Sequence, residues 1–278
     1  MSRLLSAALA AALALPCAAT VSAADRFVLV QSTTSTANSG LYDAILPKFE
    51  AATGIEARVV AVGTGQALKN ARNCDGDVLV VHARAAEEAF VAEGHGLARH
   101  ALMHNDFVIV GPADDPAGVA PAPDAPASDA AAALRAIAAA KAPFASRGDE
   151  SGTHVKERAL WAAAGVDAAA ASGTWYRETG SGMGATLNLA VGMGAYALTD
   201  RATWAAFGNK AAHRIVAEGD PALHNPYGVI RVNPERCPNV RAAEAEAFEA
   251  WLLSPAGQEA IAAYRRDGQQ LFFPDATD

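Results

Sequence analysis

Short apolar runs alternate with amphipathic segments along the first part of the chain. Three hydrophobic runs have the length of buried strands, and each is followed by a segment whose apolar residues recur at helical spacing. The predicted strands are 27–31, 57–62 and 78–81, and the predicted helices are 41–50, 66–72 and 85–92. Gly54 and Gly94 end two of these helices. Strand–helix alternation with short connections indicates an α/β lobe with a mostly parallel sheet.

A second alternation starts near Asp129. It follows a longer apolar strand and a loop rich in Pro, Asp and Ala. The predicted elements are strand 106–112, loop 114–128, helix 130–140, strand 144–146, helix 153–164, a helix ending at residue 190, strand 195–198, helix 201–207, strand 227–232 and helices 242–253 and 258–264. We therefore expect two α/β lobes joined by two crossing strands, with a ligand in the cleft between them. The expected boundaries are 25–108 for the first part of lobe 1, 109–205 for lobe 2, and 206–278 for the return crossing and the second part of lobe 1.

Residues 1–24 have the three parts of a secretory signal peptide. Arg3 carries a positive charge, residues 4–15 are Leu and Ala with a single Ser, and small residues precede the first acid, Asp25. A lipoprotein signal at Cys17 is the alternative, but Pro16 stands where a small residue is expected. No other apolar run reaches about 18 residues. We therefore expect a periplasmic protein with no membrane insertion after signal cleavage.

The charge balance argues against nucleic acid as a partner. The chain has 22 Lys and Arg against 30 Asp and Glu, a net charge of −8, and loss of Arg3 with the signal peptide leaves 21 − 30 = −9. A nucleic-acid binder usually has a basic face. An anionic ligand must therefore be held by local dipoles against the overall charge.

Cys74 and Cys237 are the two cysteines that remain after signal cleavage. In an oxidising compartment, an even pair separated by a long stretch of chain is expected to form a disulfide.

Four loops rich in hydroxyl groups and glycine precede predicted helices, at 32–36, 63–65, 146–154 and 180–184. Hydroxyls, unhindered glycine N–H groups and helix N-termini are the donors that an oxyanion needs. A single Ser or Thr there is more often a helix cap, but the first loop has more hydroxyls than one helix start can use. Arg147, in the third loop, could pair with a neighbouring acid or clamp an oxyanion. The candidate ligand-binding residues are Thr33, Thr34, Ser35, Thr64, Arg147, Ser151, Gly152 and Thr153.

Motifs for catalysis and for metal binding are absent from the sequence. There is no H-E-x-x-H or G-x-S-x-G motif, and the histidines have no ligand spacing. His154 and Glu157 share a helical face, but such a pair is more often structural. A periplasmic hydrolase using His154 would need a nucleophile–base pair that the spacing does not offer. A sensory module is disfavoured because no output segment precedes Asp278. We expect no enzyme, no cofactor and no bound metal ion.

These loops and the strands beside them resemble the tungstate-binding periplasmic proteins of the TupA type. The resemblance covers segments 32–41, 62–68, 77–83, 105–112, 146–154 and 182–187, in the family's order. The family's Thr-Thr-Thr-Ser motif falls on residues 32–35, where Ser32 replaces the first Thr, and its Ser-Arg-Gly-Asp and Ser-Gly-Thr blocks fall on 146–149 and 151–153. The resemblance implies a type II periplasmic binding-protein fold and delivery of tungstate to an ABC permease. We expect a monomer.

Other oxyanions stay open as ligands. The run from Arg147 to Thr153 also looks like phosphate-binding proteins, and Asp149 could accept the proton of hydrogen phosphate. A bare carboxylate would instead repel a fully ionised dianion such as tungstate, unless Asp149 holds Arg147 in position. A phosphate- or sulfate-binding protein of the same fold is therefore the alternative. Molybdate matches tungstate in shape and charge.

Overall fold

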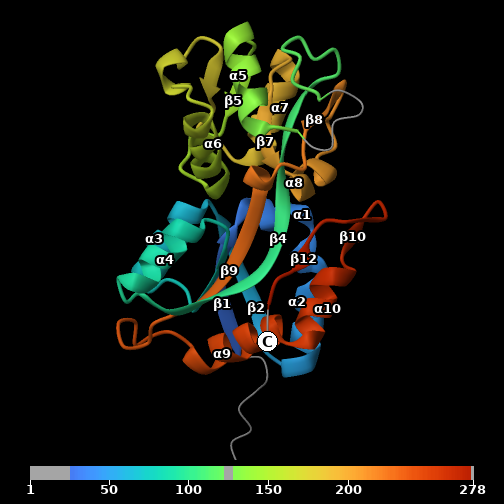
Figure 1. Cartoon of the computed structure of the whole chain (residues 1–278). Helices are drawn as coiled ribbons and strands as arrows, with labels where there is room; N and C mark the ends of the chain where they lie inside the picture. Colours follow the sequence, from blue (N-terminus) through green and yellow to red (C-terminus); the bar gives the residue numbers. More distant parts are fainter. Residues whose placement is uncertain (1–25, 122–127, 277–278) are drawn as a thin grey trace, which may run out of the picture.

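The computed structural model describes residues 26–121 and 128–276, and their elements form two lobes joined by two long strands (Figure 1). The expected signal peptide, the alternative site at Cys17 and part of the expected 114–128 loop lie outside the described residues. Among the described residues, no helix combines the length and the apolar character needed to cross a bilayer.

Lobe 1 is built on one mixed sheet with the strand order β12-β4-β9-β3-β1-β2. Its strands are β1 (Phe27–Thr33), β2 (Glu56–Val62), β3 (Val78–Val81), β4 (Gly96–Pro112), β9 (His224–Val232) and β12 (Phe273–Pro274). Its helices are α1 (Thr34–Ser39), α2 (Leu41–Thr53), α3 (Thr64–Arg72), α4 (Arg84–Ala92), α9 (Ala242–Leu253) and α10 (Pro255–Ala263), and β10 (Arg265–Arg266) and β11 (Gln269–Gln270) form a small hairpin. The parallel sheet expected from the sequence is limited to β1, β2 and β3, because β9, β4 and β12 all run antiparallel to their neighbours.

The two crossings are β4 and β9, which pair with each other from Gly96 and Val232 to Asp106 and His224 (Figure 1). β4 is longer than the predicted strand 106–112. Its first half escaped detection because register shifts interrupt the pairing with β9, so inward and outward positions do not alternate there.

Lobe 2 surrounds the far end of β4, where β7 and β8 pair with it. Its strands are β5 (Phe144–Ser146), β6 (Tyr176–Glu178), β7 (Ala197–Asp200) and β8 (His213–Ala217), and its helices are α5 (Ala130–Ala140), α6 (Gly152–Ala163), α7 (Met183–Met193), α8 (Arg201–Ala206) and the short η2 (Ala169–Ala171) and η3 (Pro221–Leu223). The sequence did not predict β8. Because Val216 and Leu223 pack in the same apolar cluster as Phe107, lobe 2 continues past the expected boundary at residue 205.

Apolar clusters cover both faces of the strands that reach the cleft. Along β4, Phe107 and Ile109 belong to one cluster of lobe 2, and Val108 and Val110 to the other. A continuous apolar run of this kind is typical of a strand that is buried on both faces. In lobe 1, α2, α9 and α10 cover one face of the sheet, and α3 and α4 cover the other. Both lobes therefore hold the strand ends at the cleft on a packed core.

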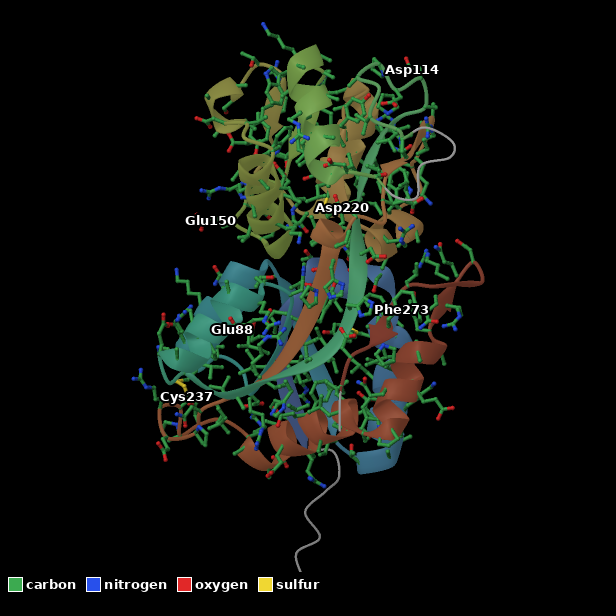
Figure 2. The ribbon with its side chains drawn as sticks, viewed as in Figure 1. Glu88, Asp114, Glu150, Asp220, Cys237 and Phe273 are labelled. Atoms are coloured by element: carbon green, nitrogen blue, oxygen red, sulfur yellow. A yellow bond between two sulfur atoms is a disulfide. The ribbon has the colours of Figure 1, made fainter. Side chains whose placement is uncertain are left out.

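Cys74 and Cys237, the pair expected from the cysteine count, form a disulfide with Cα atoms 5.3 Å apart. Cys74 follows α3, and Cys237 follows β9. Figure 2 shows Cys237 at the lower left, on the side of lobe 1 that faces away from lobe 2. The disulfide therefore belongs to the lobe 1 scaffold and not to the cleft.

Candidate functional site

The first wall of the site begins where β1 ends and α1 starts. Thr33 caps α1, because its Oγ1 accepts a hydrogen bond from the N–H of Thr36 at 3.3 Å. The hydroxyl of Ser35 lies 3.1 Å from the same Thr33 oxygen. Ser32 has a different role, since its hydroxyl donates to the carbonyl of Val80 at 2.8 Å. The run of hydroxyls is thus divided: the first ties β1 to β3, and the next three side chains line the cleft.

Thr64 begins α3 on the same wall. The residue before it, Gly63, has no side chain to cap the helix, so the N–H groups of the first turn keep no side-chain partner. Thr64 is buried, and its Oγ1 has no hydrogen-bond partner among the described residues. A buried hydroxyl left unpaired costs roughly 1–3 kcal/mol, and a ligand oxygen would remove that cost.

Arg147 forms the second wall, directly after β5. Its side chain is 4% exposed, its Nε donates to the carbonyl of Ser181 at 2.9 Å, and its terminal NH2 pairs with the carboxylate of Asp149. Asp149 also accepts a hydrogen bond from the N–H of Ser151 at 3.2 Å. Asp149 therefore ties Arg147 to the start of α6. Its carboxylate is already engaged by these two partners.

The N-terminus of α6 completes the second wall. Ser151 caps this helix by accepting a hydrogen bond from the N–H of His154 at 3.3 Å. Thr153 is buried, and its Oγ1, like that of Thr64, has no partner among the described residues. A Cβ placed on Gly152 would lie 3.0 Å from the Thr64 oxygen. The walls from the two lobes therefore approach closely, and a side chain at this position would crowd Thr64 and His82.

One small, tight cavity lies between the two walls. Its lining contains all eight residues that the sequence proposed, which are Thr33, Thr34, Ser35, Thr64, Arg147, Ser151, Gly152 and Thr153. Three other residues complete the lining: Val62, Gly63 and His82. None of the described residues that line it has a carboxylate. The cavity can therefore bind a small anion through hydroxyl and N–H donors and one guanidinium.

His82 lines this cavity, and the sequence analysis did not select it. It follows β3, its Nε2 lies 3.3 Å from the hydroxyl of Ser35, and its ring stacks on Tyr227 with centroids 4.7 Å apart. Burial lowers the pKa of His82 to about 4, although the hydrogen bond with Asn225 opposes this shift, and the charge of Arg147 lowers the pKa further. The imidazole is therefore neutral near neutral pH. The sequence feature that could have identified His82 is its position directly after β3, the strand that pairs with β1.

A buried chain of hydrogen bonds runs from His82 through both crossing strands to lobe 2. The Nδ1 of His82 lies 3.0 Å from Oδ1 of Asn225, whose Nδ2 donates to Asn105 at 2.6 Å. Asn105 in turn donates to Asp200 at 3.2 Å. Because Asn225 presents its carbonyl oxygen to His82, the imidazole proton lies on Nδ1. The Nε2 atom is left as an acceptor for the hydroxyl of Ser35, so the cavity wall and the crossing strands share one hydrogen-bond network.

The fourth loop that the sequence proposed, 180–184, does not line the cavity. Its contribution is indirect, because the carbonyl of Ser181 fixes the Nε of Arg147. Thr179 supports the same segment by donating to the carbonyl of Arg147 at 3.3 Å. The glycine pattern of this loop correctly predicted the start of a helix, α7. It did not predict that the loop would contact Arg147 instead of lining the cavity.

His154, which the hydrolase alternative would have used, and Glu157 on the same helical face also lie outside the cavity lining. The Nδ1 of His154 accepts a hydrogen bond from the N–H of Glu150 at 3.1 Å. Glu157 is buried, accepts a hydrogen bond from the hydroxyl of Tyr176 at 2.7 Å, and burial raises its pKa to about 7. Both side chains therefore support the start of α6 and the strands beneath it.

Two lobes, two crossing strands and a cavity lined with donors define a solute-binding protein. In agreement, residues 18–256 match the PBP superfamily domain. The chain therefore belongs to the PBP superfamily and, within it, to the TupA-type tungstate-binding proteins.

Three relatives support this assignment. The tungstate-binding protein TupA of Peptoclostridium acidaminophilum is 45% identical over 251 residues, which are 90% of this chain and 86% of that protein. The structure of the tungstate-binding protein TupA from Desulfovibrio alaskensis G20 is 46% identical, with a TM-score of 0.75, and covers 91% of this chain and 100% of that one. The structure of the tungstate ABC transporter from Geobacter sulfurreducens is 45% identical, with a TM-score of 0.76, and covers 86% and 98%.

Proposed function

We propose that this protein captures tungstate as a tetrahedral dianion in the cavity between its lobes. The observation that carries this proposal is a pair of buried hydroxyls, those of Thr64 and Thr153, which line one cavity together with the buried guanidinium of Arg147. Neither hydroxyl has a hydrogen-bond partner in the part of the chain that the structure describes. The uncapped start of α3 and the start of α6 add N–H groups and the positive ends of two helix dipoles. These groups offset the unfavourable net charge of the chain locally.

The position of Asp149 disfavours phosphate. Hydrogen phosphate carries a proton near neutral pH, and that proton requires an acceptor in the site. The carboxylate of Asp149 is engaged by Arg147 and by the N–H of Ser151, and it is not among the lining residues. A cavity of donors favours a fully ionised dianion, such as tungstate, molybdate or sulfate. The names of the relatives support tungstate among these three.

We further infer that a monomer of this chain delivers the bound oxyanion to the permease of an ABC importer in the periplasm. The features of residues 1–24 support export, and the relatives are named as tungstate-binding proteins or as part of a tungstate ABC transporter. The role is binding and transfer of an unchanged ion, so neither a cofactor nor a catalytic group is required.

The test is calorimetric titration of the mature protein, without an affinity tag, with tungstate, molybdate, sulfate and phosphate. We expect tungstate to bind and phosphate to bind far more weakly. Arg147→Ala is expected to weaken tungstate binding by about 2–5 kcal/mol, or about 30- to 5,000-fold, because a buried charged donor is lost. Arg135→Ala is the matched control, since this half-exposed arginine of α5 has only a 3.9 Å ion pair. Tight phosphate binding without tungstate binding, or an unchanged affinity in Arg147→Ala, would contradict the proposal.

A further inference from the structure

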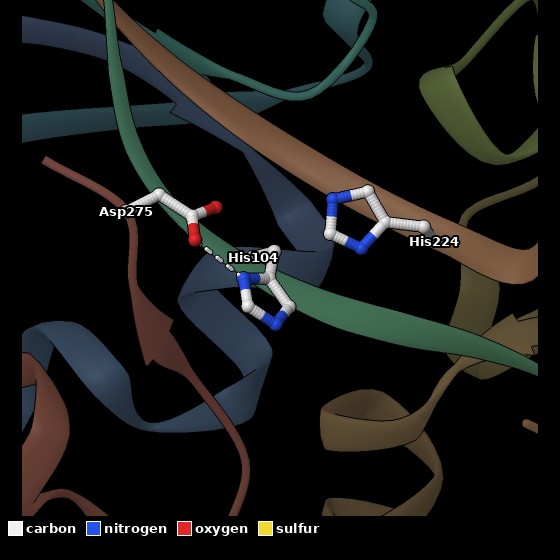
Figure 3. A group of neighbouring side chains, drawn as sticks. All are labelled: His104, His224 and Asp275. Carbon is white, nitrogen blue, oxygen red and sulfur yellow. Dashed lines mark hydrogen bonds and ion pairs between the residues drawn. The ribbon is translucent and has the colours of Figure 1, made fainter. Parts of the chain in front are cut away.

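Two histidines of the crossing strands and one aspartate of the C-terminal segment lie close together (Figure 3), and none of the three lines the oxyanion cavity. They are His104 on β4, His224 at the start of β9 and Asp275 just after β12. One ligand atom of each lies within 4.8 Å of the other two, and the Nδ1 of His104 is 2.7 Å from the carboxylate of Asp275. We propose that these three residues bind a divalent transition metal ion of the zinc type.

Strand register places the three side chains on one face of the sheet. His104 lies opposite Pro226 on β9 and opposite Phe273 on β12. His224 and Asp275 are each two residues from those partners, and positions two apart on a strand point to the same face. His104, on the central strand, is therefore a diagonal neighbour of His224 on one side and of Asp275 on the other. The pairing of the backbone strands thus sets the positions of the three residues.

The side chains are exposed enough to adjust around an ion. The side chains of His104 and Asp275 are 27% and 28% exposed, and His224 is exposed. Two of the three are held in place, because the His104 ring stacks on Phe273 at 5.2 Å and donates to Asp275. The two imidazole rings lie with centroids 4.7 Å apart. Tetrahedral zinc places its ligand atoms about 3.4 Å apart, so small side-chain rotations convert the present arrangement into a metal site.

The chemistry of the set favours zinc-like ions over calcium or magnesium. Two imidazole nitrogens are ligands of borderline softness, zinc also accepts a carboxylate oxygen, and three protein ligands leave a fourth position for water. Calcium and magnesium instead require a shell made almost entirely of oxygens. Binding of the ion by Nδ1 of His104 would require the ring proton to move from Nδ1 to Nε2, so the imidazole would stay neutral. One positive group lies nearby: the ammonium of Lys156 donates to the backbone carbonyl of His224 at 3.2 Å.

Such an ion would join three segments that are far apart in the sequence. β4 and β9 are the two crossings between the lobes, and Asp275 lies in the tail that pairs with β4. An ion bound here would therefore fix the C-terminal segment to both crossings. The histidines are 120 positions apart in the chain, which explains why the sequence showed no ligand spacing.

The experiment is titration of the mature, tag-free protein with Co²⁺ and Zn²⁺ in the absence of any oxyanion. Co²⁺ bound to nitrogen ligands in a tetrahedral site gives a visible absorption band, and Zn²⁺ is then added in competition. We expect one equivalent to bind, Mg²⁺ not to compete, and the thermal midpoint to rise with Zn²⁺. His224→Ala and Asp275→Ala are each expected to weaken binding at least tenfold.

His100→Ala is the matched control, because His100 is a 45% exposed histidine of the same strand with a single acidic neighbour, Glu249, at 3.9 Å. It is expected to bind Co²⁺ as the wild type does. His224→Gln serves if the alanine variant misfolds, with circular dichroism as the check on folding. Absence of the cobalt band in the wild type, or equal binding by the wild type and the folded His224 variants, would overturn the assignment. Because no oxyanion is used, failure here is separate from failure of the proposed function.

Discussion

Replacing Thr64 by valine removes one hydroxyl from the cavity wall and keeps the shape of the side chain. Thr64 is 2% exposed, and its Oγ1 has no partner among the described residues. In most buried positions, loss of a hydroxyl removes a hydrogen bond and destabilises the fold. Here no such bond is present among residues 26–121 and 128–276. Stability and binding are therefore expected to change independently.

The expected magnitudes follow from the surroundings of the Thr64 hydroxyl in the ligand-free protein and in the tungstate-bound protein. Without ligand, the variant escapes the penalty of an unpaired buried group, so the free energy of unfolding should stay equal or rise by up to about 1 kcal/mol. With tungstate bound, the variant loses one hydrogen bond to a charged acceptor, worth about 1.5–3 kcal/mol. The dissociation constant should rise about 10- to 150-fold.

Urea unfolding of the ligand-free protein and calorimetric titration with tungstate measure the two effects separately. Ser151→Ala is the matched control, because Ser151 lines the same cavity but its Oγ caps α6. Loss of that cap is expected to lower stability by about 1 kcal/mol. The reasoning is refuted if Thr64→Val loses stability without ligand and binds tungstate as well as the wild type does. That result would mean that Thr64 has a structural partner and no ligand contact.

Three further predictions concern the groups around the cavity and the scaffold. Asp149→Ala should weaken tungstate, molybdate, sulfate and phosphate alike, by about tenfold or more, because Arg147 loses its partner; a selective loss of phosphate in titrations would show instead that Asp149 accepts a ligand proton. Replacing Cys74 and Cys237 by alanine should lower the free energy of unfolding in urea by about 5 kcal/mol, from the loop entropy of a 163-residue separation; a loss below about 1 kcal/mol would contradict this estimate. The pKa of His82 is about 4 in the fold against 6.5 when unperturbed, so the unfolded chain takes up a proton that the fold cannot. Stability should therefore fall by about 3 kcal/mol between pH 6.5 and pH 4, relative to a His82→Gln variant measured in parallel; equal pH profiles would contradict the burial of a neutral imidazole.

The elements that could be predicted from the sequence are those with uninterrupted local patterns. The run 78–81 and the helix 242–253 have the bounds that the structure gives them. The first half of β4 could not be found, because its bulged pairing with β9 removes the two-residue alternation. β8 is a short strand that is defined by its pairing with β4, a contact between residues about one hundred positions apart.

In the candidate site, too, the residues with local sequence features could be predicted, and those that depend on distant contacts could not. Hydroxyls and glycines directly before helices are local features, so eight of the eleven residues that line the cavity were accessible from the sequence. His82 was missed because its importance depends on Asn225, which lies 143 positions away. The role of Asp149 stayed open for a different reason: a carboxylate next to an arginine can face either the ligand or the arginine. The course of the backbone after β5 turns the carboxylate of Asp149 toward Arg147 and the N–H of Ser151.

The pairing of Asp106 with His224 has a consequence for the architecture of the molecule. The chain leaves lobe 1 and returns to it at two neighbouring points, so lobe 2 is a guest domain inserted into a host. If residues 107–223 were replaced by a tight turn, β4 and β9 would form an ordinary β-hairpin, and α2, α3, α4, α9 and α10 would remain on the sheet of lobe 1. Only α8 would be lost from its core, where Ala202 packs in the same cluster as α2 and α9. The host would keep Thr33, Ser35 and Thr64, and the guest supplies Arg147 and the start of α6. Exchange of the guest alone could therefore alter oxyanion selectivity while the host remains unchanged.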